Sequence, residues 1–262
     1  MDEINKLIEV VRKLRDPNSG CPWDIKQTSK SIAKYTIEEA YEVVDAIENG
    51  DNDDLCEELG DLLLQVVFHS LIAEEIGDFD FNDVARNNAE KMIRRHPHVF
   101  NEDLKKSKIS IDRMKINWES IKEEERKKLN DNSALAGVAK ALPSLKRAEK
   151  LGKRAGAAGF DWQNFKGARN KIEEEILELD EAISEMSHKQ MEEELGDLLF
   201  SVVNLARHLA IDPEKALSIS SKKFEKRFRN MEEKIIENGK DINKMDTVDL
   251  EDLWQQSKKL IG

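Results

Sequence analysis

Four carboxylates in two short motifs are the residues of this sequence most able to do chemistry. Glu39 and Glu42 stand three positions apart, and so do Glu58 and Asp61. Because residues three or four apart share one face of a helix, each motif would present its two carboxylates in one direction. A short turn between the two helices would pack them antiparallel and bring all four carboxylates together.

The same arrangement occurs a second time further along the chain. The stretch Glu57–Leu63, EELGDLL, returns as Glu193–Leu199, an offset of 193 − 57 = 136. At that offset, the matching pairs are Glu38 with Glu174, Glu39 with Glu175, Glu42 with Glu178, Glu58 with Glu194 and Asp61 with Asp197. Such a repeat indicates two copies of one module. We expect modules at residues 1–130 and 131–262, with the boundary near Asn130.

Carboxylates gathered in this way repel one another, at about 4 kcal/mol for a close pair at an effective dielectric of ~20. A bound dication removes this cost, and all-oxygen ligands without His or Cys favour Mg²⁺, or else Mn²⁺. The predicted ligands are Glu39, Glu42, Glu58 and Asp61 in the first module and Glu175, Glu178, Glu194 and Asp197 in the second. The alternative is ordinary solvated side chains, since the chain has 54 acidic residues. Two sets at identical spacing favour the metal.

Helices must position these motifs, and the composition favours them throughout. Only 12 Gly and 5 Pro interrupt 262 residues, and helix-forming residues dominate. We expect an all-α fold, a tandem repeat of two four-helix-bundle modules. Apolar periodicity predicts helices at Ile4–Leu14, Asp53–Glu75, Phe81–Arg95, Ala134–Ala158, Phe165–Glu185, Gln190–Leu209, Pro213–Glu237 and Leu250–Leu260. A capping box of Thr36 and Glu39 is expected to open or reinforce a further helix that runs to about Ile47, and the charged stretch Trp118–Asn132 is expected to be a solvated helix or linker.

Charge and composition exclude several classes of partner. With a net charge of −12, the chain lacks the basic face that duplex nucleic acid requires, but it can bind a polyphosphate through a divalent cation. Cys21 and Cys56 form no CxxC motif, which suits a reducing compartment. The first residues lack an apolar signal core, and no apolar run approaches the roughly 18 residues of a membrane span. A cytoplasmic location is therefore expected.

The ordered motifs resemble those of the MazG family of nucleoside triphosphate pyrophosphohydrolases, within an all-α superfamily that also contains dimeric dUTPases. The resemblance covers nearly the whole chain. Its blocks are Gly20–Asp24, Tyr35–Glu39, Glu58–Asp61, Arg94–Phe100, Gly159–Trp162, Glu174-Glu175, Glu193–Asp197, Lys223–Arg227 and Trp254. The resemblance implies a homodimer that hydrolyses an NTP such as ATP, or a dNTP, with Mg²⁺, to the monophosphate and pyrophosphate.

The family motifs also imply roles for individual residues. Metal ligation falls to Glu175, Glu178, Glu194 and Asp197, and nucleotide contact to Lys171, Glu174, Glu193, Lys223, Arg227 and Trp254. Where the family often has a basic residue this chain has Gln190, and the adjacent Lys189 is the candidate substitute. The catalytic candidates are Glu174, Glu175 and Glu38. We expect Glu174 or Glu38, as carboxylates not fully committed to metal, to hold or deprotonate the attacking water, and Trp254 to stack on the base.

The two modules differ at positions that matter for a polyphosphate. Lys171 corresponds to Tyr35, since 171 − 136 = 35. The turn expected before the second motif helix is Ser187–Gln190 in the C-terminal copy, but the acidic Asp51–Asp54 in the N-terminal copy. Acidic residues there would repel a polyphosphate. We therefore expect the C-terminal module to be the main catalyst.

Other protein classes fit the sequence less well. A di-iron bundle needs paired Glu-x-x-His motifs, and only an unpaired Glu185-x-x-His188 occurs. A Nudix hydrolase is suggested by Glu193–Gly196, but Gln190 stands where its motif needs Glu, and strand patterning is absent. The alternative outside the enzymes is a structural helical adaptor, which would show no metal-dependent nucleotide binding.

Overall fold

The computed structural model describes residues 2–101 and 133–261, together with 110, 114, 118, 120, 121, 125 and 131. Within these residues, the regular secondary structure is helical and no strand occurs, which confirms the all-α prediction. Contacts divide the chain into two units, Met1–Lys122 and Glu123–Gly262, each with one copy of the repeat. The expected boundary near Asn130 and most of the expected linker Trp118–Asn132 lie outside the described residues.

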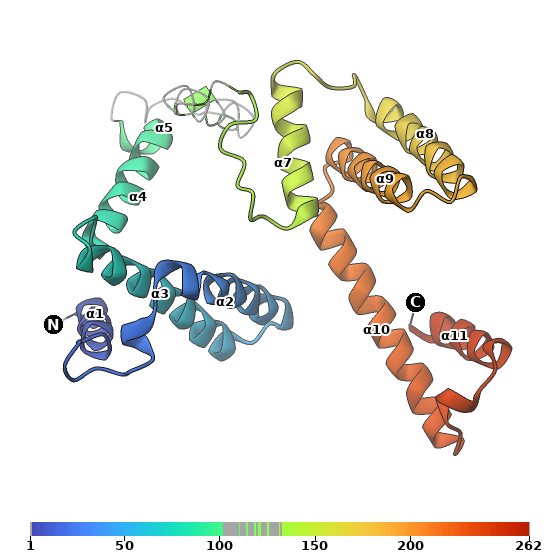
Figure 1. Cartoon of the computed structure of the whole chain (residues 1–262), viewed down its shortest axis with the longest axis horizontal. Helices are drawn as coiled ribbons and strands as arrows, with labels where there is room; N and C mark the ends of the chain where they lie inside the picture. Colours follow the sequence, from blue (N-terminus) through green and yellow to red (C-terminus); the bar gives the residue numbers. More distant parts are fainter. Residues whose placement is uncertain are drawn as a thin grey trace. The chain divides into compact units, whose positions relative to one another are not determined.

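The first unit is organised around one long helix. Its helices are α1 (Glu3–Leu14), α2 (Ser29–Asn49), α3 (Asn52–Glu75), α4 (Phe81–Arg95) and the single turn α5 (Pro97–Phe100), with a 3-10 turn at Asp24–Lys26. Helix α3 packs against α1, α2 and α4 (Figure 1). The core of the unit, from α1, α2 and α3, is Val11, Ile32, Val67, Phe68, Leu71 and Ile72.

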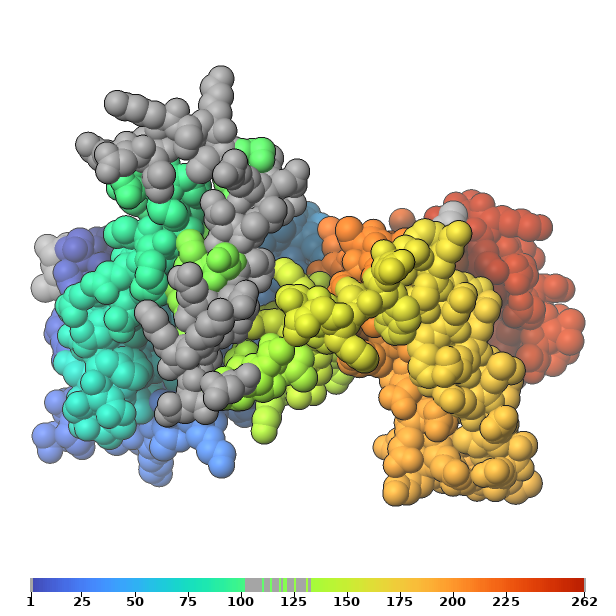
Figure 2. Space-filling model, turned by 90° about the horizontal axis from the view of Figure 1, so that it is seen from above, coloured from blue at the N-terminus to red at the C-terminus, as the bar shows by residue number. Residues whose placement is uncertain are grey.

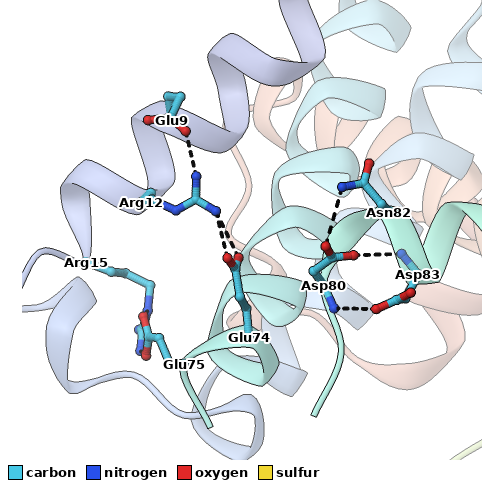
Figure 3. Close-up of polar contacts among 8 residues, drawn as sticks. All are labelled: Glu9, Arg12, Arg15, Glu74, Glu75, Asp80, Asn82 and Asp83. Carbon is cyan, nitrogen blue, oxygen red and sulfur yellow. Dashed lines mark hydrogen bonds and ion pairs between the residues drawn. The ribbon is translucent and has the colours of Figure 1, made fainter. Parts of the chain in front are cut away.

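Ion pairs hold the end of α1 against the end of α3. Both Arg12 and Arg15 reach the last turn of α3, as Figure 3 shows. Nη2 of Arg12 lies 3.0 Å from Oε2 of Glu74, and the buried Arg15 donates two hydrogen bonds of 2.7 and 2.6 Å to Glu75. Two N–H groups of the Arg15 guanidinium donate to the two oxygens of the Glu75 carboxylate. This bidentate geometry is the one that the guanidinium group favours with a carboxylate.

In the second unit, the repeat forms a helical hairpin. The helices are α7 (Ser144–Ala157), α8 (Phe165–Ser184), α9 (His188–His208), α10 (Pro213–Glu237) and α11 (Thr247–Ile261), with a 3-10 turn at Ile242–Lys244. Helices α8 and α9 pack along each other, α7 packs on α9, and α11 packs on α10. Figure 2 shows α8, in yellow, at the surface of this unit.

Two predicted helix starts are wrong. Helix α2 begins at Ser29, because Thr28 accepts a hydrogen bond from the Ser31 backbone and Ser31 returns one in a capping box. Thr36 therefore lies inside α2, where its hydroxyl is 3.0 Å from Nε2 of His69. The helix expected from Ala134 begins only at Ser144, after Pro143, because the preceding segment forms turns.

The expected turns before the second motif helices are also wrong, since all but the first residue of each segment lie within those helices. Ser187 is the N-cap of α9, and its side chain accepts from the backbone of Gln190. Asp51 caps α3 in the same way, accepting from Asp53 and Asp54. Each motif helix thus begins with a capping side chain, and the hairpin turn is shorter than expected.

Candidate metal and nucleotide site

Three carboxylates of the second unit converge between α8 and α9. Glu175 comes from α8, while Glu194 and Asp197 stand three apart on α9. One oxygen from each lies within 4.8 Å of the others, and we call these residues the second acidic triad. Glu175 is only 4% exposed. Because a buried carboxylate is costly without a positive partner, this triad calls for a cation.

Lys171 already supplies one positive charge beside the second acidic triad. Its Nζ lies 2.8 Å from Glu175, 2.6 Å from Glu174 and 3.8 Å from Glu178. Hydrogen bonds that Lys171 donates to Glu174 and Glu175 raise the pKa of Lys171 well above its usual value. One ammonium group therefore pairs with three carboxylates, and within the described part of the chain it forms no ion pair with Glu194 or Asp197.

Glu178 lies beside this group rather than in the triad. Partial desolvation raises the pKa of Glu178, the charge of Lys171 opposes this shift, and Glu175 and Glu174 add to it. The structure thus brings three of the four predicted ligands of the second unit within reach of one ion, and it places Glu178 next to Lys171. Ligation by all four stays a prediction.

The first unit has a matching cluster, the first acidic triad, formed by Glu39, Glu42 and Glu58. Desolvation, a hydrogen bond with Glu42 and the charge of Asp61 raise the pKa of Glu39, against a weak hydrogen bond of 3.4 Å from Gln65. Asp61, the fourth predicted ligand, therefore lies close enough for its charge to raise the pKa of Glu39, but it is not part of the triad. Both triads offer oxygen donors alone, and each could hold a metal ion.

The two triads differ in the positive charge beside them. Among the residues that the structure describes, no lysine or arginine pairs with a carboxylate of the first acidic triad. Tyr35 stands at the position equivalent to Lys171, and its ring lies 6.1 Å from that of Trp23 and 4.6 Å from Nζ of Lys34. This difference agrees with the expectation that the second unit contains the main catalytic site. That expectation remains a prediction.

The predicted nucleotide contacts fall into two groups. Glu174 and Lys171 lie at the second acidic triad, and Lys189 is 3.6 Å from Glu193 on α9, with both side chains exposed. Lys223, Arg227 and Trp254 lie on the α10–α11 pair, where Trp254 packs on Phe224 at 5.1 Å between ring centroids. In the described part of the chain, none of these three pairs with the triad. Glu38, the remaining catalytic candidate, is exposed on α2 outside the first acidic triad.

A cavity of about 500 Å³ opens beside the second acidic triad, and sequence reasoning missed it. Its lining includes Lys171, Glu175 and Asp197 at the charged part, and Phe160, Trp162 and Phe200 among the apolar side chains. Ser201, Asn204 and Arg207, about one, two and three turns after Asp197 on α9, also line it. The only signal in the sequence was the block Gly159–Trp162, whose place in space depends on contacts with residues far along the chain.

The chain matches the family model of the MazG nucleotide pyrophosphohydrolase domain twice, at residues 27–100 and 163–231. It is 44% identical over 264 aligned residues to a nucleoside triphosphate pyrophosphohydrolase of Escherichia coli K12, covering 99% of this chain and 98% of that protein. It is 43% identical over 253 residues to a Thermotoga maritima protein named nucleoside triphosphate pyrophosphohydrolase/pyrophosphatase MazG, covering 97% and 94%.

The chain belongs to the MazG family. A crystal structure of a mazG-related protein from Thermotoga maritima is also similar, with 28% identity and a TM-score of 0.38, covering 45% of this chain and 98% of that one. Each MazG segment contains one complete acidic triad. Trp162 lies immediately before the second MazG segment, and Trp254 lies beyond its end.

A strong ion pair fixes the loop that leads into the second MazG segment. Asp161 accepts hydrogen bonds of 2.8 and 2.6 Å from Arg207, and it lies 3.0 Å from Nε2 of His208. Chiefly through the hydrogen bond from Arg207, the pKa of Asp161 falls to about 2. The pair thereby ties the loop before α8 to the last turn of α9.

This shift predicts a pH-dependent contribution to stability. A carboxyl group whose pKa is lowered by folding stabilises the fold above its unfolded pKa, and this contribution is lost as pH falls through the folded value. We expect Asp161→Asn to lower the free energy of unfolding by about 1–2 kcal/mol at pH 7, a figure reduced for partial exposure. The difference from the wild type should shrink between about pH 4 and pH 2. Urea titrations across this pH range measure the difference in the free energy of unfolding. A difference that does not change with pH would contradict a stabilising role for the ionised Asp161.

Proposed function

We propose that this chain is a metal-dependent nucleoside triphosphate pyrophosphohydrolase that converts an NTP or dNTP to the monophosphate and pyrophosphate. The observation that carries the proposal is the second acidic triad, with one nearly buried carboxylate and a lysine beside it. Relatives that are 43–44% identical over almost the whole chain bear the name of this activity. We propose Mg²⁺ as the ion, with Mn²⁺ as a substitute, because all the donors are oxygen atoms.

Phosphoryl chemistry depends mostly on positioning and charge stabilisation. A bound Mg²⁺ would supply charge neutralisation at phosphate oxygens and a bound water of lowered pKa. Glu175, Glu194 and Asp197 would hold that ion, with Glu178 as the proposed fourth ligand. Lys171, which now pairs with Glu174 and Glu175, would then be free to contact the phosphates.

The exposed Glu174 is the proposed holder of the attacking water. Glu174 pairs with Lys171 and is not part of the triad. It would therefore not be a metal ligand, and it could accept a proton from the water without weakening the binding of the metal ion. Glu38 would hold the attacking water in the first unit. We propose that the first unit has a weaker catalytic activity, or else a regulatory or structural role. Glu193 and Lys189, at the start of α9, are proposed nucleotide contacts, as are Lys223, Arg227 and Trp254.

We further propose that the protein acts as a homodimer. Several large apolar side chains on the α8–α9 hairpin are exposed in the single chain, including Ile176, Leu177, Ile183, Leu195 and Leu199. We propose that these side chains form the dimer interface, because large exposed apolar patches mark interaction surfaces. The net charge of −12 argues against duplex nucleic acid as a partner.

The identity of the products tests the proposed activity. With ATP or a dNTP and Mg²⁺, we expect ³¹P NMR to show the monophosphate and pyrophosphate in equal amounts. Chelation by EDTA should abolish turnover, and excess Mg²⁺ should restore it. Release of the diphosphate and inorganic phosphate would contradict the proposal, because the bond between the β- and γ-phosphates would then be the one cleaved.

A further inference from the structure

The second acidic triad lies midway along the α8–α9 hairpin, whose two ends are closed in different ways. At one end the chain joins the helices through Glu185–Ser187, nine residues from Glu175 (184 − 175) and from Asp197 (197 − 188). At the other end, α8 begins at Phe165 and α9 reaches Arg207, ten residues from the same carboxylates (175 − 165 and 207 − 197). No turn joins the two helices there, about 15 Å from the triad at 1.5 Å per residue. We call this the open end of the hairpin.

Between the triad and the open end, the two helices border a cavity instead of packing fully against each other. The cavity of about 500 Å³ is lined from α8 by Lys171 and Glu175. From α9 its lining includes Ser201, Asn204 and Arg207. Interlocking side chains fix the separation of packed helices, and their contribution is smaller where a cavity intervenes. In this half of the hairpin, the separation of α8 and α9 therefore depends on contacts at the open end.

A bidentate ion pair closes the open end of the hairpin. Nη1 and Nη2 of Arg207, in the last turn of α9, donate hydrogen bonds of 2.8 and 2.6 Å to the two oxygens of Asp161, in the loop before α8. The side chains of Arg207 and Asp161 are 17% and 25% exposed, so water screens this pair less than an ion pair on the open surface. Because the guanidinium fork fits a carboxylate in one plane, the pair fixes both the distance and the orientation of the loop relative to α9.

Neighbouring groups hold both side chains in the orientation that the ion pair needs. Nε of Arg207 donates a hydrogen bond of 2.9 Å to Oδ1 of Asn204, one turn earlier in α9. Helix α7 also approaches closely. A Cβ at Gly152 would lie 3.3 Å from Nε of Arg207, and a Cβ at Gly156 would lie 2.7 Å from Oδ2 of Asp161. Because neither side chain has room to turn away, the ion pair holds the loop before α8 in one place on α9.

We infer that Asp161 and Arg207 are positioning residues for the metal site: their ion pair sets the separation of α8 and α9, and so keeps Glu175 within reach of an ion on α9. The inference rests on the proposed function, which places a divalent cation at the second acidic triad. The ligands of a metal ion must be held within about 0.5 Å of the geometry that the ion requires. Glu175 is the member of the triad that α8 contributes. Without the ion pair, movement of α8 would therefore remove this ligand from the ion.

The affinity for Mn²⁺ in the absence of nucleotide tests this inference. Electron paramagnetic resonance measures it in a Glu39→Gln, Glu58→Gln background, which removes the first acidic triad as a second site. In this background, Asp161→Asn and Arg207→Met should each weaken Mn²⁺ binding by about tenfold. Arg169→Met is the matched control, because the ion pair of Arg169 lies within α8 and does not connect the two helices. This variant should bind Mn²⁺ within about twofold of the background protein.

The signs of the two effects separate positioning from long-range electrostatics. If only the charges acted on the ion, loss of the negative charge of Asp161 would weaken Mn²⁺ binding, and loss of the positive charge of Arg207 would strengthen it. Weaker binding in both variants therefore supports the inference. Any other pattern in variants that circular dichroism shows to be folded would overturn it, and so would a tenfold loss with Arg169→Met.

Gly156→Ala provides a second test should either variant not fold. This change keeps every charge, favours the helix in which Gly156 lies, and places a Cβ against the carboxylate of Asp161. It should weaken Mn²⁺ binding by about three- to tenfold, and an unchanged affinity would overturn the inference. Failure of the proposed function looks different, because the background protein would bind Mn²⁺ while the wild type released no pyrophosphate from ATP. A background protein that binds no Mn²⁺ would overturn the inference itself.

Discussion

Glu175→Gln should lower kcat/KM for NTP hydrolysis by about 100-fold or more, because it removes the buried carboxylate around which the second acidic triad is built. The matched change is Glu39→Gln, since 39 + 136 = 175. We expect this variant to retain at least about half of the wild-type activity, because no lysine or arginine of the described residues pairs with a carboxylate of the first acidic triad. The size and shape of the side chain are kept in both variants, so the comparison isolates the charge.

Initial rates of pyrophosphate release at several substrate concentrations measure both effects. Circular dichroism should show that each variant is as helical as the wild type. A larger loss with Glu39→Gln than with Glu175→Gln would place the main site in the first unit. Equal losses would indicate that the two units work together.

Lys171→Met should have two opposite effects. It should lower kcat/KM by about 100-fold, because the charge that would meet the triphosphate is lost. It should also tighten Mg²⁺ binding to the nucleotide-free protein by about tenfold, because Nζ lies 2.8 Å from Glu175 and competes with a metal ion for that carboxylate. Calorimetric titration with Mg²⁺ and steady-state kinetics separate the two effects.

The matched control for this change is Tyr35→Lys in the first unit, at the equivalent position. It should weaken metal binding at the first acidic triad and leave the rate almost unchanged. A Lys171→Met variant with wild-type metal affinity, wild-type kcat/KM and a lowered melting temperature would mean that Lys171 only stabilises the fold. In that case its place beside the triad would carry no catalytic role.

In each unit the structure brings together three of the four carboxylates that the sequence predicted to converge, because local spacing on a helix decides which side chains share a face. Glu175 on α8 meets Glu194 and Asp197 on α9 once two amphipathic helices are joined by a short turn. Helix starts were harder: Thr28 and Thr36 are both plausible caps, and only the hydrogen bond from the Ser31 backbone distinguishes them. Propensity alone does not rank two such sites.

The cavity could not be predicted, because contacts across long stretches of chain form it. Asp161 and Arg207 are 46 residues apart, and their pair places Trp162 beside the acidic triad. No periodicity in the sequence indicates that two residues so far apart along the chain are in contact. The predicted contacts Lys223, Arg227 and Trp254 show the same limit, because a family motif names residues without placing α10 and α11 relative to the hairpin.

We expect carboxylates of α8 and α9 in the second unit to hold a divalent cation. Counting bound Mn²⁺ by electron paramagnetic resonance, in the wild type and in the Glu175→Gln, Asp197→Asn double variant, tests it directly. The double variant should bind at least one ion fewer per chain than the wild type, and Mg²⁺ should displace that ion. Equal numbers of bound ions in both proteins would contradict this expectation.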